Sequence, residues 1–441
     1  MAVSLRKKAV EILINIEKNG AYINIEMNKL RGSNEFIDKD IRLIGEIVNG
    51  VIKRKITLDY IISKHSSTKL NKIAPFVLNV LRIGVYQIIF MDKIPDSAAV
   101  DECVKIIKKS SVYRLSGYVN AVLRSIDKTD FEGIFANNIE TLSIKYSYPK
   151  WLIQKWVDNF GFDFAKELAE SLNKKSPLYI RCSTLTNSIS DFENKLKNSQ
   201  IDYSIVKIDE LPKYNYSFRI NNVKDINLIP GFNDGNFYIQ DPAASLAAFV
   251  LEPECGDTVI DVCAAPGGKS VFIADLMQNK GTIISCDIYD HKIKLIAQNA
   301  QKHKASCIIP TINDATKLNP DWVDKADRVL CDVPCSGFGI IRKKPDIKYA
   351  REEEDIKTLS QMGKKILEVS SRYLKKDGIL VYSTCTIEKE ENEDVINEFL
   401  NSHPEFSLFP FGNTKGFYTS YPNKTDTDGF FICRLKKNGV K

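Results

Sequence analysis

The chain has 441 residues, of which 44% are hydrophobic and 27% charged, which is typical of a folded globular protein with two or three domains. No apolar run approaches the roughly 20 residues that a membrane helix needs, and the N-terminus lacks a signal-peptide pattern, so we expect a cytoplasmic protein with no membrane partner. The ten cysteines include no Cys-x-x-Cys pair, which argues against zinc-ribbon and iron–sulfur sites, and we expect no metal.

The positive charge is concentrated near the N-terminus. Residues 1–130 contain 22 Lys and Arg against 14 Asp and Glu, whereas the whole chain has a net charge of +6. A basic segment joined to a near-neutral one favours a docking surface for a polyanion. A solvated helical face explains the same charge equally well.

Residues 1–135 are predicted to form an all-helical domain. Apolar residues recur at helical spacing, as at Ile12 and Ile16, and the stretch 75–89 is apolar nearly all round, which is typical of a central core helix. Another helix is expected over 97–109, with Ser97 in the N-cap position. The pattern predicts a compact helical bundle.

Residues 140–240 change character and predict a small α+β module of RRM-like type. An aromatic-rich helix is expected to start at Pro149, and strands are expected at 178–182 and 217–220, with a short helix near 191–197.

From residue 241 to 441, strands and helices alternate, which predicts a doubly wound, Rossmann-like α/β domain. Its strands are expected at Thr258–Val262, Thr282–Cys286, Cys307–Ile309, Arg328–Cys331 and Ile379–Tyr382.

The first of these strands leads into a tight, glycine-containing loop. Its residues are Cys263, Ala264, Ala265, Pro266, Gly267, Gly268 and Lys269. Small residues allow a ligand to approach the backbone closely. The loop lacks the first glycine of a Walker motif, so phosphate binding is not expected.

Acidic residues follow the next two strands. Asp287 is placed where a carboxylate often binds ribose hydroxyls, and Asn313-Asp314 could bind an adenine edge. Each Asp alone is more often a turn residue, but the ordered set favours a nucleoside cofactor without a pyrophosphate. S-adenosylmethionine is the natural candidate.

Two cysteines follow the last two strands. Cys335 lies in Asp332-Val333-Pro334-Cys335 and Cys385 in Ser383-Thr384-Cys385. Because the carboxyl ends of neighbouring parallel strands converge, both thiols should lie in one crevice, where nucleophilic chemistry, metal binding or a disulfide are all conceivable. Each alone could also be a buried thiol in a turn.

A methyl donor beside two thiols favours one reaction. Addition of a thiolate to carbon 6 of cytosine makes carbon 5 nucleophilic enough to accept a methyl group, and Asp332 could stabilise the ring N3 and the exocyclic amine.

These motifs resemble those of RNA 5-methylcytosine methyltransferases. The resemblance rests on residues 261–269, on 332–339 with Arg342 and Pro345-Asp346-Ile347-Lys348 downstream, on 383–386, and on the Glu-Glu-Asn-Glu run at 390–393. Residues 95–102 and 119–124 resemble the NusB-like RNA-binding domain, and the combination is similar to the Sun/Fmu group, the RsmB type of 16S rRNA methyltransferase.

The resemblance implies roles for individual residues. Cys385 would be the nucleophile, Cys335 would assist product release, and Asp332 would stabilise the base. The cofactor S-adenosylmethionine would contact the loop Cys263 to Lys269, with Asp287, Asp314 and Asp332. Thr427-Asp428-Gly429-Phe430-Phe431 would line the RNA side of the site. The chain departs from the family pattern at Thr386, often Ser, and at Arg342-Lys343-Lys344, where paired arginines are common.

The expected partner is therefore 16S rRNA and not DNA, with the protein acting as a monomer. A tRNA cytosine methyltransferase with the same catalytic domain is an alternative, as is a non-catalytic RNA-binding or assembly factor. A Cys335–Cys385 disulfide is disfavoured in a reducing compartment.

Overall fold

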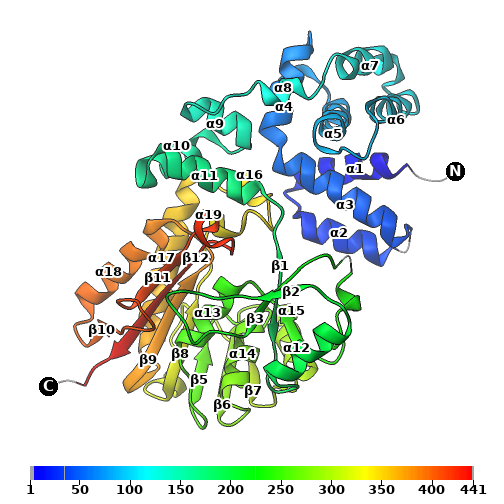
Figure 1. Cartoon of the computed structure of the whole chain (residues 1–441). Helices are drawn as coiled ribbons and strands as arrows, with labels where there is room; N and C mark the ends of the chain where they lie inside the picture. Colours follow the sequence, from blue (N-terminus) through cyan, green and yellow to red (C-terminus); the bar gives the residue numbers. More distant parts are fainter. Residues whose placement is uncertain (1–3, 34, 224, 440–441) are drawn as a thin grey trace. The chain divides into compact units, whose positions relative to one another are not determined.

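A computed structural model describes residues 4–33, 35–223 and 225–439 (Figure 1). The chain divides into two compact units, Met1–Lys174 with Lys343–Arg351, and Lys175–Arg342 with Glu352–Lys441. Within the described residues, no helix is long and apolar enough to cross a membrane, and no cluster of His, Cys, Asp or Glu side chains is suited to a metal ion.

The first unit is helical. Helix α5 is its centre, because Val77, Ile83 and Ile89 point to different sides of the helix and are all buried. An apolar helix of this kind is stable only when other helices surround it. The helices of the unit are α1 (Leu5–Asn19), α2 (Ile23–Gly32), α3 (Asp38–Lys53), α4 (Lys55–His65), α5 (Pro75–Phe90), α6 (Asp96–Lys108), α7 (Ser116–Arg124), α8 (Thr129–Glu132), α9 (Ile139–Tyr146), α10 (Lys150–Phe160), α11 (Phe162–Asn173) and α16 (Ile347–Ala350).

The predicted cap of α6 is wrong. The helix begins at Asp96, so Ser97 lies inside its first turn, and Pro95 occupies the N-cap position. The extended backbone of Pro95 sets the direction in which the chain enters the helix, and the negative charge of Asp96 in the first turn suits the positive end of the helix dipole.

The segment Lys343–Arg351 returns to the helical unit from the second unit. The side chain of Lys348 is fully buried there, and its Nζ lies 3.1 Å from the carbonyl oxygens of both Lys53 and Ser147 and 3.7 Å from the centre of the Tyr148 ring. Burial holds the pKa of Lys348 well below its usual range, whereas the surrounding oxygens and the ring favour the ammonium form. Lys348 therefore links the segment Lys343–Arg351 to Lys53 and Ser147 of the helical unit.

The second unit starts with a small α+β module. Its antiparallel sheet has the order β2-β3-β1-β4, built from β1 (Leu178–Cys182), β2 (Tyr203–Ile205), β3 (Ser217–Ile220) and β4 (Phe237–Ile239). Helix α12 (Ile189–Asn198) packs Phe192 against Phe218 and Phe237, with ring centres 5.5 and 5.7 Å apart. These contacts give the module a core of its own.

The rest of the second unit contains an eight-stranded sheet with the order β10-β12-β9-β8-β5-β6-β7 and β11 paired to β12. Its strands are β5 (Thr258–Asp261), β6 (Thr282–Asp287), β7 (Ile308–Ile312), β8 (Ala326–Asp332), β9 (Leu374–Thr384), β10 (Phe406–Leu408), β11 (Phe417–Ser420) and β12 (Phe430–Lys437). Strands β5 to β9 pair in parallel, as predicted.

Helices cover both faces of this sheet. One face packs on α13 (Pro242–Val250), α14 (Gly268–Leu276) and α15 (Asp290–Lys302), and the other on α17 (Glu353–Ser371) and α18 (Glu393–Ser402). The strand order reverses direction between β5 and β8, and ligands of open α/β sheets bind at the carboxyl ends of the strands beside such a point.

An antiparallel edge extends the predicted parallel sheet. Strand β12 pairs with β9, from Phe431 opposite Thr384 to Lys436 opposite Ile379. Residues 430–435 are all buried, so they lack the alternation of apolar and polar residues that identifies a half-exposed strand.

A buried ion pair joins the α+β module to the last turn of α14. Arg181 on β1 lies 2.9 Å from Asp275 on α14, and neither side chain is exposed to solvent. Arg181 also donates to the Gly268 carbonyl oxygen at 3.0 Å, and Asp275 accepts from the Ser183 hydroxyl at 2.9 Å. The pair therefore connects the module to the loop that was predicted to bind the cofactor.

Breaking this pair should destabilise the second unit strongly. Arg181→Met leaves the Asp275 carboxylate buried without its counter-ion, at a cost of about 3–5 kcal/mol of unfolding free energy. Urea denaturation followed by circular dichroism measures this loss. The control is the double variant Arg181→Met with Asp275→Leu, which should lose less than the two single variants added together. A loss below about 1 kcal/mol in Arg181→Met would contradict the assignment.

Candidate active site

The two predicted cysteines lie together at the carboxyl ends of β8 and β9. Their Sγ atoms are 3.2 Å apart, and both side chains are partly exposed. The juxtaposition follows from the parallel register, in which Asp332 lies opposite Ser383. Cys335 and Cys385 each lie a few residues beyond these positions, so the pairing of the strands brings the two turns into contact.

Buried polar side chains from the segment after Cys385 fix both turns. Glu391 accepts a hydrogen bond from the Ser336 backbone N–H at 2.7 Å and another from the Ser336 hydroxyl. Asn392 accepts from the Thr384 hydroxyl at 2.6 Å and donates to the Thr386 carbonyl oxygen at 3.2 Å. The sequence pattern predicts no function for these residues, although Glu391 and Asn392 belong to the Glu-Glu-Asn-Glu run at 390–393 that resembles the family.

The environment distinguishes the two thiols. The hydrogen bond with Cys385, together with burial, raises the pKa of the Cys335 thiol well above its usual range. The raised pKa favours a proton on Cys335 over a free thiolate there, and either sulfur can be the donor in the contact between the two thiols.

Asp332 lies at the end of β8 between two donors. One oxygen accepts from Lys269 Nζ at 2.6 Å and the other from the Ser383 hydroxyl at 2.8 Å. Burial acts to lower the pKa of Lys269, but the Asp332 carboxylate outweighs it and the pKa is raised. Lys269 therefore remains a cation that holds the Asp332 carboxylate in place, which links the glycine loop to the thiol crevice.

Gly339 lies where three backbone segments meet. Its N–H donates to the Cys385 carbonyl oxygen at 3.1 Å, and its own carbonyl accepts from the Gly429 N–H at 2.9 Å. A Cβ at residue 339 would lie 2.0 Å from the Gly429 oxygen, so only glycine permits this approach. The predicted hairpin residues 427–431 therefore lie directly against the Cys385 turn.

The predicted cofactor loop forms a tight turn after β5. The Ala264 N–H donates to the Cys286 carbonyl oxygen at 2.7 Å, and the Gly267 N–H donates to the Ala264 carbonyl oxygen at the same distance. Gly267 has φ 103°, a left-handed conformation that disfavours other residues. The loop then enters α14 at Gly268, followed by Lys269.

The acidic residues after β6 and β7 differ in how they are engaged. Asp287 is buried, with its carboxylate 3.4 Å from Lys292 Nζ. Asp314 accepts from the Thr316 hydroxyl at 2.6 Å, which lowers the pKa of Asp314. Beside it, the Asn313 side-chain nitrogen is buried without a hydrogen-bond partner among the described residues, and such a donor suits a ligand acceptor.

Asp261, at the end of β5, was not predicted as a site residue. It is fully buried and accepts a hydrogen bond from the Ser270 hydroxyl at 2.7 Å. Burial raises the pKa of Asp261 to about 7, an effect that the Ser270 hydrogen bond opposes. A strand reading Thr-Val-Ile-Asp gives no signal that its last side chain faces inward beneath the loop.

Comparisons with known proteins identify the family. A model of the 16S rRNA methyltransferase RsmB/F family matches residues 248–436, the NusB family model matches 3–128, and a ferredoxin-like domain of RsmF/B-like methyltransferases matches 148–210. A probable ribosomal RNA small subunit methyltransferase B from Bacillus subtilis is 35% identical over 99% of both chains. The chain belongs to the RsmB/F family of 16S rRNA methyltransferases.

Solved structures agree with this result. The crystal structure of PH0851 matches 99% of this chain and all of its own, with 27% identity and a TM-score of 0.78. A methyltransferase homolog from Pyrococcus horikoshii matches 69% of this chain with 28% identity and a TM-score of 0.61. The predicted family and the predicted NusB-like and methyltransferase folds are confirmed, and the small α+β module that was predicted to be RRM-like is matched by the ferredoxin-like domain.

Members of this family use S-adenosylmethionine, which confirms the predicted cofactor. The residues at the carboxyl ends of β5, β6 and β7 fit this cofactor. Gly267 forms a tight left-handed turn, the Asp287 carboxylate could accept from ribose hydroxyls, and the buried Asn313 side-chain nitrogen could donate to a base. None of these groups requires a pyrophosphate or a metal as a partner.

The raised pKa of Asp261 predicts how stability depends on pH. Between about pH 4 and 7 the folded protein keeps a proton that the unfolded chain has lost, so this residue's contribution to stability falls as the pH rises and is fully lost above about 7. Asp261→Asn removes this dependence. The unfolding free energy of the variant minus that of the wild type should increase by about 1.4 kcal/mol per pH unit between pH 5 and 7. Urea titrations at several pH values measure the difference, and a difference that does not change with pH would refute it.

Proposed function

We propose that this protein methylates carbon 5 of a cytosine in 16S rRNA, with Cys385 as the covalent nucleophile. The observation that supports the proposal best is the pair of sulfur atoms 3.2 Å apart beside the Asp332–Lys269 pair. A methyltransferase acting on oxygen or on an exocyclic nitrogen needs no thiol, whereas carbon 5 of cytosine needs covalent activation.

The Cys385 thiolate adds to carbon 6 of the ring, and the electrons of the carbon 5–carbon 6 double bond shift toward carbon 5 and the N3–O2 side of the ring. S-adenosylmethionine, when bound at the β5 loop, supplies the methyl group as an electrophile. Transfer of the carbon 5 proton to a base such as water then returns the electrons to the ring and expels Cys385 as a thiolate, so the sulfur is regenerated and the product is 5-methylcytosine.

The neighbours of Cys385 favour this sequence of steps. The Cys335 thiol can donate its proton in a hydrogen bond to the Cys385 sulfur before attack and again as the sulfur leaves. Asp332 is held by Lys269 and Ser383 at the carboxyl end of β8, next to the thiols, where it could accept from the exocyclic amine of the cytosine.

The loop Cys263, Ala264, Ala265, Pro266, Gly267, Gly268 and Lys269 would hold the cofactor, with Asp287 and Asp314 as further contacts. The described contacts of Asp314 make it the weakest member of this set, because its carboxylate is engaged by Thr316 and Lys317. The neighbouring Asn313 is the better candidate for the adenine edge.

The nucleophile is tested with Cys385→Ala. The variant should lose 5-methylcytosine formation by at least about 10³-fold, because covalent activation of carbon 6 is lost, while its affinity for S-adenosylmethionine stays within about twofold of the wild type. Mass spectrometry of 16S rRNA and of tRNA from cells that carry either form measures the product. A mark lost from tRNA instead of 16S rRNA would favour the tRNA alternative, and an unchanged 16S map would reject the nucleophile.

Cys335 is tested separately, because its predicted function is product release. Cys335→Ala should allow attack and methyl transfer but slow the departure of Cys385, so that an RNA–protein adduct accumulates. Denaturing gel electrophoresis with labelled 16S rRNA detects the adduct. The double variant Cys335→Ala with Cys385→Ala should form none. Normal turnover without an adduct in the single variant would mean that Cys335 only packs beside Cys385.

A further inference from the structure

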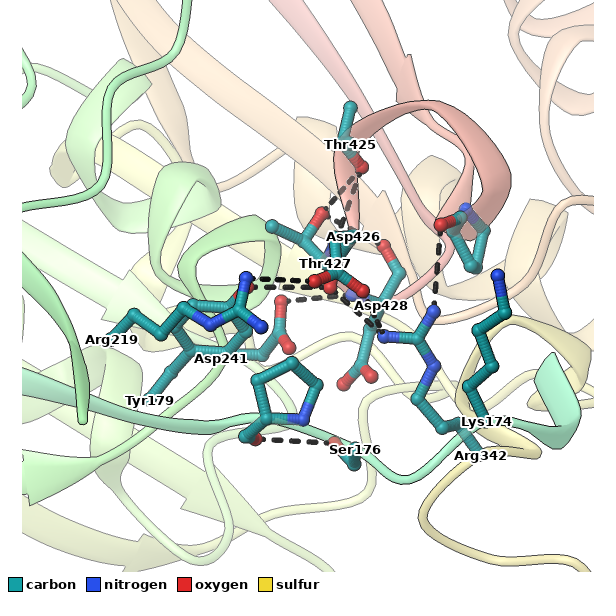
Figure 2. Close-up of polar contacts among 12 residues, drawn as sticks. Lys174, Ser176, Tyr179, Arg219, Asp241, Arg342, Thr425, Asp426, Thr427 and Asp428 are labelled. Carbon is teal, nitrogen blue, oxygen red and sulfur yellow. Dashed lines mark hydrogen bonds and ion pairs between the residues drawn. The ribbon is translucent and has the colours of Figure 1, made fainter. Parts of the chain in front are cut away.

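A carboxylate near the active site is bound by two arginines that come from different parts of the second unit. Asp426 Oδ2 lies 2.9 Å from Arg219 Nη1, and Asp426 Oδ1 lies 2.9 Å from Arg342 Nη1 (Figure 2). Arg219 is on β3 of the α+β module, whereas Arg342 follows the short helix η5 (Phe338–Ile340). Two guanidinium groups on the two oxygens of one anion are also the arrangement in which arginines bind phosphate.

The carboxylate faces solvent. The side chains of Arg219 and Asp426 are 43% and 46% exposed, whereas that of Arg342 is 1% exposed. The Arg219–Asp426 pair, with both side chains exposed, contributes at most about 1 kcal/mol to stability, so it explains little of how the loop is held. The exposure also means that another anion can reach Arg219 directly, whereas it can reach the buried Arg342 only where the Asp426 carboxylate moves away.

The loop is held by its backbone instead. The Asp426 carbonyl oxygen accepts from Arg342 Nη1 at 2.9 Å and from the Tyr179 hydroxyl at 3.3 Å. The Asp428 N–H donates to the buried Asp241 carboxylate at 3.1 Å. These contacts do not involve the Asp426 carboxylate, which can therefore move away without releasing the loop (Figure 2).

The position of the loop relates this anion site to the catalytic centre. Asp426 is three residues from Gly429, a distance of at most about 10 Å along the chain. Gly429 donates to Gly339, which donates to the Cys385 carbonyl oxygen. An anion bound by Arg219 and Arg342 would thus lie at the rim of the site that receives the cytosine.

We propose that Arg219 and Arg342 bind a backbone phosphodiester of the RNA close to the target nucleotide, and that the Asp426 carboxylate occupies this position in the free protein. The inference rests on the proposed RNA substrate. Binding exchanges one anion for another on the same two arginines, so the loop stays in place while the nucleotide is positioned. Asp241 and Asp428 are buried, whereas the Asp426 side chain is exposed, so the phosphodiester would approach from the side of the Asp426 carboxylate.

Two substitutions should change the affinity for RNA in opposite directions. Asp426→Asn removes the competing negative charge, and Asn tolerates the φ of 57° at this position, so the affinity for 16S rRNA should rise several-fold. Arg219→Gln removes a phosphate contact, so the affinity should fall about tenfold. The slope of log affinity against log salt concentration should become shallower by about 0.7–0.9. Filter binding of the full chain to 16S rRNA at several KCl concentrations measures both quantities.

Lys375→Gln is the matched control. Lys375 has the same exposure as Arg219 and pairs with Asp327 at 2.7 Å, but it lies at the start of β9, at the opposite end of the strand from Cys385. This variant also loses one positive charge, and its salt dependence should equal that of the wild type. Thermal unfolding of all three variants should remain within a few degrees of the wild type, since backbone contacts hold the loop.

Two results would overturn the inference while leaving the proposed function intact. Asp426→Asn binding RNA no better than the wild type would mean that the carboxylate does not compete with RNA. Arg219→Gln binding with an unchanged salt dependence would mean that the arginine meets no phosphate. Wild-type protein without salt-dependent affinity for 16S rRNA would instead refute the RNA substrate, and this site with it.

Discussion

The parallel pairing of β8 with β9 is the constraint on which the active site depends. It places Asp332 opposite Ser383, and a shift by one residue would turn either side chain to the other face of the sheet. The turns that follow carry Cys335 and Cys385, and their sulfur atoms meet only because both strands end at the same level. The contact between the two thiols is therefore a consequence of the register of β8 and β9. The turns after these strands are short, so the positions of the strand ends determine the positions of the cysteines.

Buried polar groups hold the turns after β8 and β9 in a fixed geometry. Glu391 is buried and binds the Ser336 side of the crevice, while Asn392 binds the Thr384 side. A buried carboxylate is costly unless it is hydrogen-bonded, and here the cost is offset by donors from the turn that presents Cys335. Near the start of α14, Arg181 donates to the Gly268 carbonyl oxygen, and its ion pair with Asp275 holds the last turn of the same helix. The cofactor side and the thiol side meet at the Lys269–Asp332 contact.

The sequence was informative where local patterns determine structure. Alternating strands and helices predicted the sheet, and the rule that parallel strand ends converge predicted that Cys335 and Cys385 would meet. Glu391 was not assigned a function, because an acidic run is typical of an exposed helix and its partner Ser336 is 55 residues away. Lys348 was grouped with the catalytic motifs, yet it is buried in the helical unit. Contacts between distant residues of this kind have no signature in hydrophobic periodicity or turn residues.

The most direct test of the account locates the covalent bond. Full-length protein is incubated with S-adenosylmethionine and 16S rRNA that contains 5-fluorocytidine, whose carbon 5 carries no proton to lose, so elimination stops and the adduct persists. Protease digestion and tandem mass spectrometry then identify the modified peptide. We predict that the nucleotide is attached to Cys385. Attachment to Cys335, or no adduct with 16S rRNA under conditions that permit turnover of the normal substrate, would contradict the mechanism.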